Sequence, residues 1–203
     1  MPNNKNPSEK IGVPPHKKPW PTDTKYDPEL LQNGDYRNVI DKYRYWFLEE
    51  IKNDMAKNAL PIQIAIENFQ YDFNIGTIVR NANAFNVSAV HIIGRRHWNK
   101  RGAMVTDRYL QVYYHKTVAD FVDAVKGWNI VAVDNVPGAT KLQNFTFPKK
   151  PVLVFGAEGP GLSEEMILAS SATLAIEQYG STRSLNVGVA SGIILYEAVQ
   201  ACG

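Results

Sequence analysis

The stretch from Val152 to Ser163 reads V-L-V-F-G-A-E-G-P-G-L-S. Its four apolar residues predict a short buried strand that ends at Phe155, where a glycine-rich turn begins. Ser163 is a typical N-cap residue, and two glutamates follow it in the first turn of a helix predicted to run to about Ala169. A strand, a tight turn and a capped helix form the repeating unit of an α/β fold.

The same unit recurs on both sides of this stretch. Short apolar runs predict strands at 62–66, 89–93, 112–115, 130–133 and 172–176. The segments between them predict helices at 74–85, 118–126 and 186–201. This alternation predicts the fold class, which is α/β with a mostly parallel sheet flanked by helices on both faces.

The first 60 residues follow a different pattern. Seven of the 12 prolines fall within the first 28 residues, with Asn and Lys between them, which predicts an extended arm with little apolar surface to bury. Apolar residues at three- and four-residue spacing then predict a helix from about Asn38 to Asn58, and Pro61 closes it. The predicted domains are therefore 1–60, an arm plus a helix, and 61–203, the α/β domain.

Composition excludes several classes of protein. The chain has 203 residues and a net charge of +2, which excludes nucleic-acid binding through bulk charge. Its single cysteine, Cys202, excludes a disulfide framework within the chain and a thiolate metal cage. The four histidines have no metal-ligand spacing, so no metal is expected. The sequence has neither an apolar run that could span a membrane nor an apolar signal-peptide core, so we expect a cytoplasmic protein.

Positive charge is concentrated in one segment. From His91 to Lys116 the chain carries six Lys or Arg residues against a single Asp, a net charge of +5. His97 and Trp98 lie among them, and basic residues interleaved with an aromatic suit a phosphate backbone and an unstacked base. A solvated surface loop explains the same pattern equally well. The candidate RNA-binding residues of this segment are Arg95, Arg96, Lys100 and Arg101.

A polar turn precedes the helix predicted at 74–85. It reads N-I-G-T-I-V-R from Asn74 to Arg80. Gly76 allows something to approach closely at the start of the helix. Arg80 follows one turn later on the same side, where its guanidinium could fork onto a phosphate. A solvated helix arginine is the alternative.

Two further turns carry polar side chains. In the glycine-rich turn quoted first, Glu158 would repel a phosphate and favour hydroxyls or a cation, and an exposed glutamate in a tight connection is the alternative. The last turn reads S-T-R-S-L-N-V-G-V-A over 181–190 and leads into a helix that is apolar nearly all round. We therefore expect that helix to be buried, with Ser184 or Asn186 as its N-cap. Two glycines four residues apart would let another helix pack closely on it.

In order and composition, the three turns resemble the three motifs of the SpoU, or TrmH-like, branch of the SPOUT RNA methyltransferases. Those motifs are N-x-G-x-x-x-R, F-G-x-E-G-x-G-L-S and S-L-N-V, and the resemblance covers about 61–203. The chain departs from the usual pattern at Asn86, Glu177 and Gly188, where the family commonly has Gly, Pro and Ser.

The resemblance implies a fold with a C-terminal trefoil knot, a homodimer, no metal, and S-adenosyl-L-methionine as the cofactor. It implies methylation of a ribose 2′-hydroxyl in tRNA or rRNA. The implied catalytic residues are Arg80, Asn74, Glu158, Ser184 and Asn186. The implied cofactor-binding residues are Gly156, Gly159, Ile176, Leu185, Asn186 and Ala190.

Arg80 is implied to lie next to the target ribose and phosphate. We expect it to stabilise charge and position the ribose, because the pKa of a guanidinium is too high for ready proton loss. Base action by Arg80 would require that its proton pass to phosphate or water. Two rival interpretations are a non-catalytic RNA-binding relative with the same basic face and a nucleotide-binding protein that uses the 156–161 turn. Glu158 and the missing P-loop lysine count against the second of these.

Overall fold

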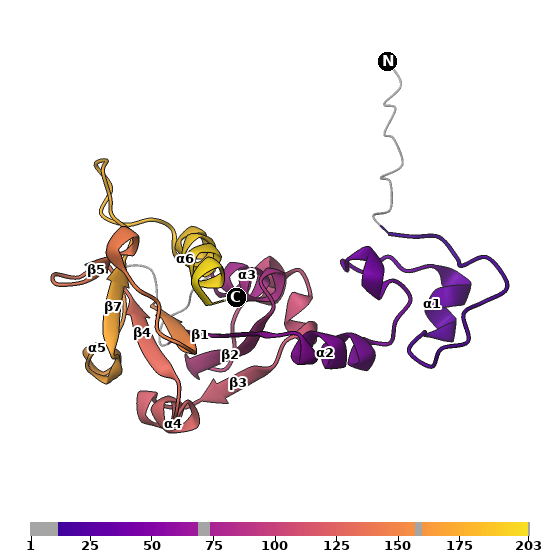
Figure 1. Cartoon of the computed structure of the whole chain (residues 1–203), viewed down its shortest axis with the longest axis horizontal. Helices are drawn as coiled ribbons and strands as arrows, with labels where there is room; N and C mark the ends of the chain where they lie inside the picture. The colour runs from indigo at the N-terminus through magenta and orange to yellow at the C-terminus, as the bar shows by residue number, and fades with distance from the viewer. Residues whose placement is uncertain (1–11, 69–73, 157–159, 203) are drawn as a thin grey trace, which may run out of the picture. The chain divides into compact units, whose positions relative to one another are not determined.

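A computed structural model describes residues 12–68, 74–156 and 160–202. The chain divides into two compact units, with the boundary between Lys57 and Asn58. The larger unit contains a seven-stranded sheet, and the smaller one contains short helices (Figure 1). None of the helices in these three stretches is long and apolar enough to cross a membrane.

All seven strands of the sheet run parallel, in the order β3-β2-β1-β6-β4-β7-β5. The prediction of a mostly parallel sheet is therefore confirmed, and the strand that the sequence missed is β5, which has only two residues. β1 lies between β2 and β6 inside the sheet and is buried along most of its length, as expected for a strand covered on both faces. The strands are β1 (Leu60–Asn68), β2 (Val87–Gly94), β3 (Val112–His115), β4 (Asn129–Val133), β5 (Thr140–Lys141), β6 (Pro151–Phe155) and β7 (Ala172–Ala175).

Helices cover both faces of this sheet. α3 (Ile75–Ala84) and α6 (Val187–Cys202) pack side by side over one face, and α4 (Val118–Ala124) and α5 (Glu164–Ala169) lie on the other (Figure 1). The face under α4 and α5 is an apolar core in which Phe121 and Met166 meet the alternate strand residues that point toward them. Two short 3₁₀ helices, η2 (Lys100–Ala103) and η3 (Thr106–Tyr109), follow β2 and pack against α3.

A buried polar cluster interrupts this core near the β3 edge. His91 on β2 is 4% exposed, and its Nε2 lies 3.1 Å from Oε1 of Gln63. Its Nδ1 lies 2.9 Å from Nε2 of His115. Because an amide oxygen only accepts, Nε2 of the neutral His91 ring carries the proton and Nδ1 accepts from His115. Burial, with a smaller effect from His115, lowers the pKa of His91 to about 4.

The smaller unit contains α1 (Pro28–Asn33), the 3₁₀ helix η1 (Asp41–Tyr43) and α2 (Leu48–Lys57). The single helix predicted from Asn38 to Asn58 is therefore wrong in its first half. Tyr45 has φ 63°, a left-handed conformation that ends any right-handed helix, so the regular helix begins only at Leu48.

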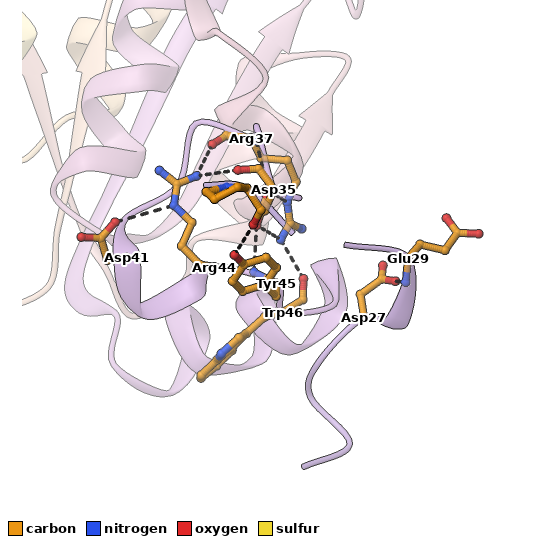
Figure 2. A network of polar contacts seen from close by, with 9 residues as sticks. Asp27, Glu29, Asp35, Arg37, Asp41, Arg44, Tyr45 and Trp46 are labelled. Atoms are coloured by element: carbon orange, nitrogen blue, oxygen red, sulfur yellow. Dashed lines mark hydrogen bonds and ion pairs between the residues drawn. The ribbon is translucent and has the colours of Figure 1, made fainter. Parts of the chain in front are cut away.

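A buried carboxylate holds the segment between α1 and α2 in place (Figure 2). Asp35 is fully buried and accepts hydrogen bonds from Nε of Arg37 at 2.8 Å and Nη2 of Arg37 at 2.7 Å. The backbone N–H of Tyr45 donates to the same carboxylate at 2.9 Å. Burial alone would raise the pKa of Asp35, but the hydrogen bonds from Arg37 and Tyr45 outweigh it and hold that pKa below its ordinary value.

Candidate functional site

A pocket opens where three neighbouring strands end. β4, β6 and β7 are parallel, so their carboxyl ends meet at one edge of the sheet, which is where α/β folds bind ligands. The pocket there has a volume of about 470 Å³. Its lining from the strand ends consists of Val133, Asp134, Asn135, Phe155, Gly156, Leu174, Ala175 and Ile176, with Gly161 from the turn after β6.

The segment that leads into α6 completes the pocket. It contributes Gln178, Ser184, Leu185, Asn186, Val187 and Ala190. Five of the cofactor-binding residues implied by the resemblance lie among the described residues, and all five line this pocket. They are Gly156, Ile176, Leu185, Asn186 and Ala190. Gly159 and Glu158 lie outside the described residues.

The turn after β6 crosses itself tightly at Gly156. A Cβ placed there would lie 2.3 Å from the carbonyl carbon of Gly161 and 2.6 Å from the nitrogen of Leu162. Any side chain at Gly156 would therefore collide with backbone. Glu67 at the end of β1 holds the far end of the turn, since its carboxylate accepts from the N–H and the Oγ of Ser163, both at 2.7 Å.

Sequence reasoning missed Asp134, which follows β4 directly and lines the pocket. Its Oδ2 accepts from the N–H of Leu162 at 2.8 Å, and its Oδ1 accepts from the N–H of Asn135 at 2.7 Å. The amide of Asn135 donates to the carbonyl of Arg183 at 2.8 Å. The one available signal was a carboxylate placed directly after a predicted strand, which is too common to single it out.

One hydrogen bond joins the first turn to the last. Nδ2 of Asn186 donates to Oδ1 of Asn74 at 2.9 Å, across 112 positions of sequence. Oδ1 of Asn186 accepts from the N–H of Val189 at 3.2 Å, so Asn186 is the N-cap of α6. Asn74 precedes α3 but makes no side-chain capping bond to it. Its carboxamide is instead directed to the pocket edge.

Arg80 is exposed on α3, and its guanidinium has no hydrogen-bond or ion-pair partner in the described part of the chain. The next residue fixes α3 to α6, since Nδ2 of Asn81 donates to the carbonyl of Gly188 and to Oγ of Ser191, both at 2.9 Å. A Cβ at Gly188 would lie 2.8 Å from Cγ2 of Thr77, so the glycine permits this close packing. Arg80 is thus held on a rigid helix with its charged group in solvent.

The basic segment after β2 lies directly against the first turn. A Cβ at Gly76 would be 2.8 Å from the nitrogen of Ala103 and 2.9 Å from Cα of Gly102. Gly76 therefore allows the backbone of the basic segment to pack closely against the start of α3. Asn68, which is buried at the end of β1, donates from Nδ2 to the carbonyl of Arg95 at 2.6 Å and so fixes where the segment begins.

Some basic side chains of this segment contact other side chains of the described chain, and others do not. Lys100 pairs with Asp107 at 2.7 Å, and the guanidinium of Arg96 lies 4.8 Å from the ring centre of Tyr114. The guanidinium groups of Arg95 and Arg101 have no partner among the residues described. Trp98 is only 9% exposed, so its ring is covered in this structure and not presented to a base. The aromatic residue packs inward, where it anchors the segment.

Within 12–68, 74–156 and 160–202, no group of three or more His, Cys, Asp or Glu side chains is arranged to hold a metal ion. The polar groups around the pocket are amides, hydroxyls and the Asp134 carboxylate, which suit hydrogen bonding to an organic ligand. None of the described lining residues is Lys or Arg, so the described lining offers a phosphate no cationic side chain.

The model of the SpoU rRNA Methylase family matches residues 61–196. The chain belongs to the SpoU rRNA methylase family. A curated relative, the tRNA (guanosine(18)-2′-O)-methyltransferase of Escherichia coli K12, is 28% identical over 149 residues. That match covers 71% of this chain and 65% of the relative, so the chain spans slightly less than two thirds of the relative's length.

Solved structures of SpoU-type enzymes share the fold. The A. aeolicus TrmH/SpoU tRNA modifying enzyme is 26% identical with a TM-score of 0.66, over 76% of this chain and 81% of that one. An AdoMet-bound rRNA methyltransferase from Sinorhizobium meliloti is 25% identical with a TM-score of 0.61, over 71% and 59% respectively. The family match covers most of the larger unit.

Proposed function

We propose that this protein is an S-adenosyl-L-methionine-dependent methyltransferase that acts on a ribose 2′-hydroxyl of tRNA or rRNA. The observation that carries the proposal is the hydrogen bond between Asn74 and Asn186, which joins the first motif to the third at the edge of the pocket. The names of the E. coli and S. meliloti relatives support the reaction and the cofactor. Family membership favours a catalytic role over RNA binding alone.

The pocket residues fit the proposed cofactor. A volume of about 470 Å³ lies within the range of about 300–1,000 Å³ that small-molecule sites occupy. Ile176, Leu185 and Ala190 supply an apolar wall for the adenine, and the tight turn at Gly156 places backbone polar groups beside it. Asp134 and Ser184 supply polar groups for the ribose and the amino-acid portion. When bound, the cofactor supplies an electrophilic methyl group.

The chain's own residues perform positioning and charge stabilisation. Asn74 and Asn186 hold each other and orient the ribose, because their hydrogen bond restricts both carboxamides. Arg80 binds the adjacent phosphate and stabilises the developing alkoxide charge. Its guanidinium has no ion-pair partner in the described part of the chain, so it need not give one up to bind RNA. We assign Ser184 to the cofactor side of the site, and Glu158 to the orientation of Arg80 or of a neighbouring hydroxyl.

RNA binding is assigned to the basic segment. Arg95 and Arg101, whose guanidinium groups have no partner within the described residues, carry most of this role together with Arg80. Arg96 and Lys100 contribute less charge to a ligand, since Arg96 lies over Tyr114 and Lys100 pairs with Asp107. The RNA affinity is expected to fall with salt, as for any site built on phosphate contacts.

We also propose a homodimer, a C-terminal trefoil knot, a metal-free reaction and a cytoplasmic location. The expectation that the last helix is buried is wrong for one face of α6, where Val189 is 54% exposed, Ile193 39% and Tyr196 54%. This exposed apolar stripe supports the dimer. These residues follow helical spacing and so share one face. The stripe begins beside Asn186 and Ala190, so a second copy seated there would border the pocket.

Methyl transfer from labelled S-adenosyl-L-methionine to unmodified tRNA and rRNA transcripts tests the proposal, with nucleoside analysis of the product. We expect a 2′-O-methylated nucleoside with wild type and a loss of about 100-fold or more with Arg80→Ala. Lys126→Ala, an exposed residue on the opposite face of the sheet, is the control. Equal activity of wild type and Arg80→Ala would contradict the assigned role of Arg80. Failure of the folded protein to bind S-adenosylhomocysteine in a calorimeter would favour a non-catalytic RNA-binding module.

A further inference from the structure

The basic segment contains a strained pair of apolar residues. Met104 has φ 49° and Val105 has φ 69°, so two consecutive non-glycine residues are left-handed. This conformation is unfavourable for most residues, and especially for a β-branched one such as Val105. Both side chains are nevertheless about half exposed, Met104 at 52% and Val105 at 53%. Two apolar side chains are therefore exposed to solvent on a strained stretch of backbone.

The surroundings of the pair hold it in this conformation. Oγ1 of Thr106 donates to the carbonyl of Ala103 at 2.6 Å, and both residues are buried. The ion pair between Lys100 and Asp107 joins η2 to η3 across the turn. Below it, Gly102 packs against the start of α3, where a Cβ would lie 3.2 Å from the nitrogen of Thr77. Strained backbone that is fixed by surrounding contacts in this way recurs in ligand-binding loops.

Charge identifies the partner that this pair suits. Arg101 precedes Met104 by three residues and Arg108 follows Val105 by three, and both arginines are exposed. Neither guanidinium has a hydrogen-bond or ion-pair partner among the described residues. An apolar tip between two free arginines matches a stacked nucleic acid, in which phosphates flank apolar base faces. The pair also replaces the buried Trp98 as the part of this segment that a base can contact.

We propose that Met104 and Val105 form an apolar wedge that inserts against a base of a folded RNA substrate and opens one base step beside the target nucleotide. This inference rests on the proposed function for the identity of the ligand as RNA. The wedge lies on the segment that packs against Gly76, at the start of the helix that carries Arg80. It therefore makes base-paired or stacked RNA, rather than an unstructured strand, the preferred substrate class.

The test uses the full chain and a double variant, Met104→Asn/Val105→Gly. Asn and Gly both tolerate the left-handed region, so the backbone keeps its path while the apolar surface is lost. The probes are an RNA hairpin with 2-aminopurine in its stem, whose fluorescence rises on unstacking, and full-length unmodified tRNA transcripts. Met104→Leu keeps the wedge, and Leu168→Asn removes an apolar side chain that is 78% exposed on α5.

We expect wild type, Met104→Leu and Leu168→Asn to raise the 2-aminopurine fluorescence on binding. The double variant should abolish that rise and bind the tRNA transcripts about tenfold more weakly, as expected for loss of one base contact. Its melting temperature should stay the same or increase, because strain is relieved. Arg101→Gln/Arg108→Gln should weaken binding and flatten its salt dependence, yet keep the fluorescence rise at saturation.

Two results would overturn the wedge. An unchanged fluorescence rise and unchanged affinity in the double variant would show that the pair does not contact bases. A shift of the double variant to a smaller species in analytical ultracentrifugation would instead assign the pair to an interface between copies. The proposed function fails by a different result. If wild type bound and unstacked the hairpin but transferred no methyl group to any transcript, this would support the wedge while contradicting the methyltransferase activity.

Discussion

The two units of this chain bury different kinds of group. In 58–203, the interior consists of strand and helix side chains that alternate regularly, such as Ile64, Ile66 and Phe155. In the described part of the smaller unit, the buried apolar residues are Leu31, Ile51 and Met55, and the segment between α1 and α2 is instead arranged around the carboxylate of Asp35. The larger unit depends on apolar packing, whereas the smaller one depends on a few charge-assisted hydrogen bonds.

This difference predicts different weaknesses. A buried carboxylate with several donors is costly to disturb, because each donor left without it becomes an unsatisfied buried group. A parallel sheet loses little from one surface change, but it responds strongly to extra volume or to a charge placed inside it. Treatments that affect one unit and not the other therefore distinguish the two.

The largest expected effect is on the smaller unit. Asp35→Asn keeps the shape of the side chain but removes the charge that Arg37 and the N–H of Tyr45 require. Breaking one partner of a buried pair typically costs about 3–5 kcal/mol. We expect amide hydrogen exchange in 12–57 to become fast while 60–68 and 151–155 in the sheet remain protected, as measured by mass spectrometry.

Asp41→Asn is the matched control for that change. Asp41 also pairs with an arginine, but its carboxylate lies 3.6 Å from Nε of Arg44 and its side chain is 98% exposed. Exposed pairs of this kind contribute little. Equal exchange rates in the Asp35 and Asp41 variants would contradict the idea that burial of the carboxylate holds the unit together.

Acid should affect the larger unit first. Since the pKa of His91 is lowered to about 4, the folded state keeps this ring neutral while the unfolded state takes up a proton below about pH 6.5. Its stabilising contribution is complete above pH 6.5 and is lost as the pH falls toward 4, by at most about 3 kcal/mol. The pKa of His115 is also lowered, first by burial, which adds to the loss.

Urea unfolding between pH 7 and pH 4 measures this dependence. His91→Gln removes one titrating ring, so its unfolding free energy should change less over the same range, whatever its stability at pH 7. The pKa of the Asp35 carboxyl is lowered, so its ionised form stabilises the folded smaller unit. That stabilisation is lost only as the pH falls below the ordinary value of 3.8. If 12–57 opened in hydrogen exchange before the sheet did at pH 5, the comparison would be reversed.

A larger side chain at a closely packed glycine of the sheet domain should destabilise the larger unit and leave the smaller one unchanged. Gly156→Ala places a methyl group within 2.6 Å of three backbone atoms of Gly161 and Leu162, which cannot move aside as a flexible side chain would. Overpacking of this kind costs about 1–3 kcal/mol. We expect a lower melting temperature and loss of S-adenosylhomocysteine binding in calorimetry. Gly180→Ala, where a Cβ would meet nothing within 4 Å, should leave both unchanged.

The same contrast explains what the sequence could predict. Apolar runs placed β2, β4 and β6 to within about two residues, because each of these strands is buried along most of its length. In the smaller unit, the apolar spacing predicted correctly only the part of the helix that forms α2. The decisive contacts of this unit join Asp35 to side-chain and backbone donors up to ten residues away, and a left-handed Tyr45 has no sequence signature.

For the candidate site, motif order predicted which residues would meet but not why. Asn74, Gly156 and Asn186 were identified from three separate turns, and Asn74 and Asn186 are in direct contact. Asp134 was missed because a lone polar residue after a strand is common. The burial of Trp98 was missed because composition does not reveal which side of a loop an aromatic residue faces. Tertiary packing decides both.

The smallest expected effect lies at the rim of the pocket. Glu177, which stands between the lining residues Ile176 and Gln178, forms an ion pair with Lys141 and accepts from the hydroxyl of Tyr179 at 2.6 Å. Lys141 and then Tyr179 hold the pKa of Glu177 below its ordinary value, so it is charged at neutral pH.

Glu177→Gln should therefore loosen the rim and weaken S-adenosylhomocysteine binding by about two- to threefold, because an exposed ion pair contributes little. The difference from wild type should shrink at high salt, which screens the pair. Glu177→Pro introduces the residue that the motif resemblance implies at this position, and it should bind with wild-type affinity and without any salt dependence, because the ring restricts the backbone directly. If both variants bound as wild type does at low salt, Glu177 would be a surface residue without influence on the pocket.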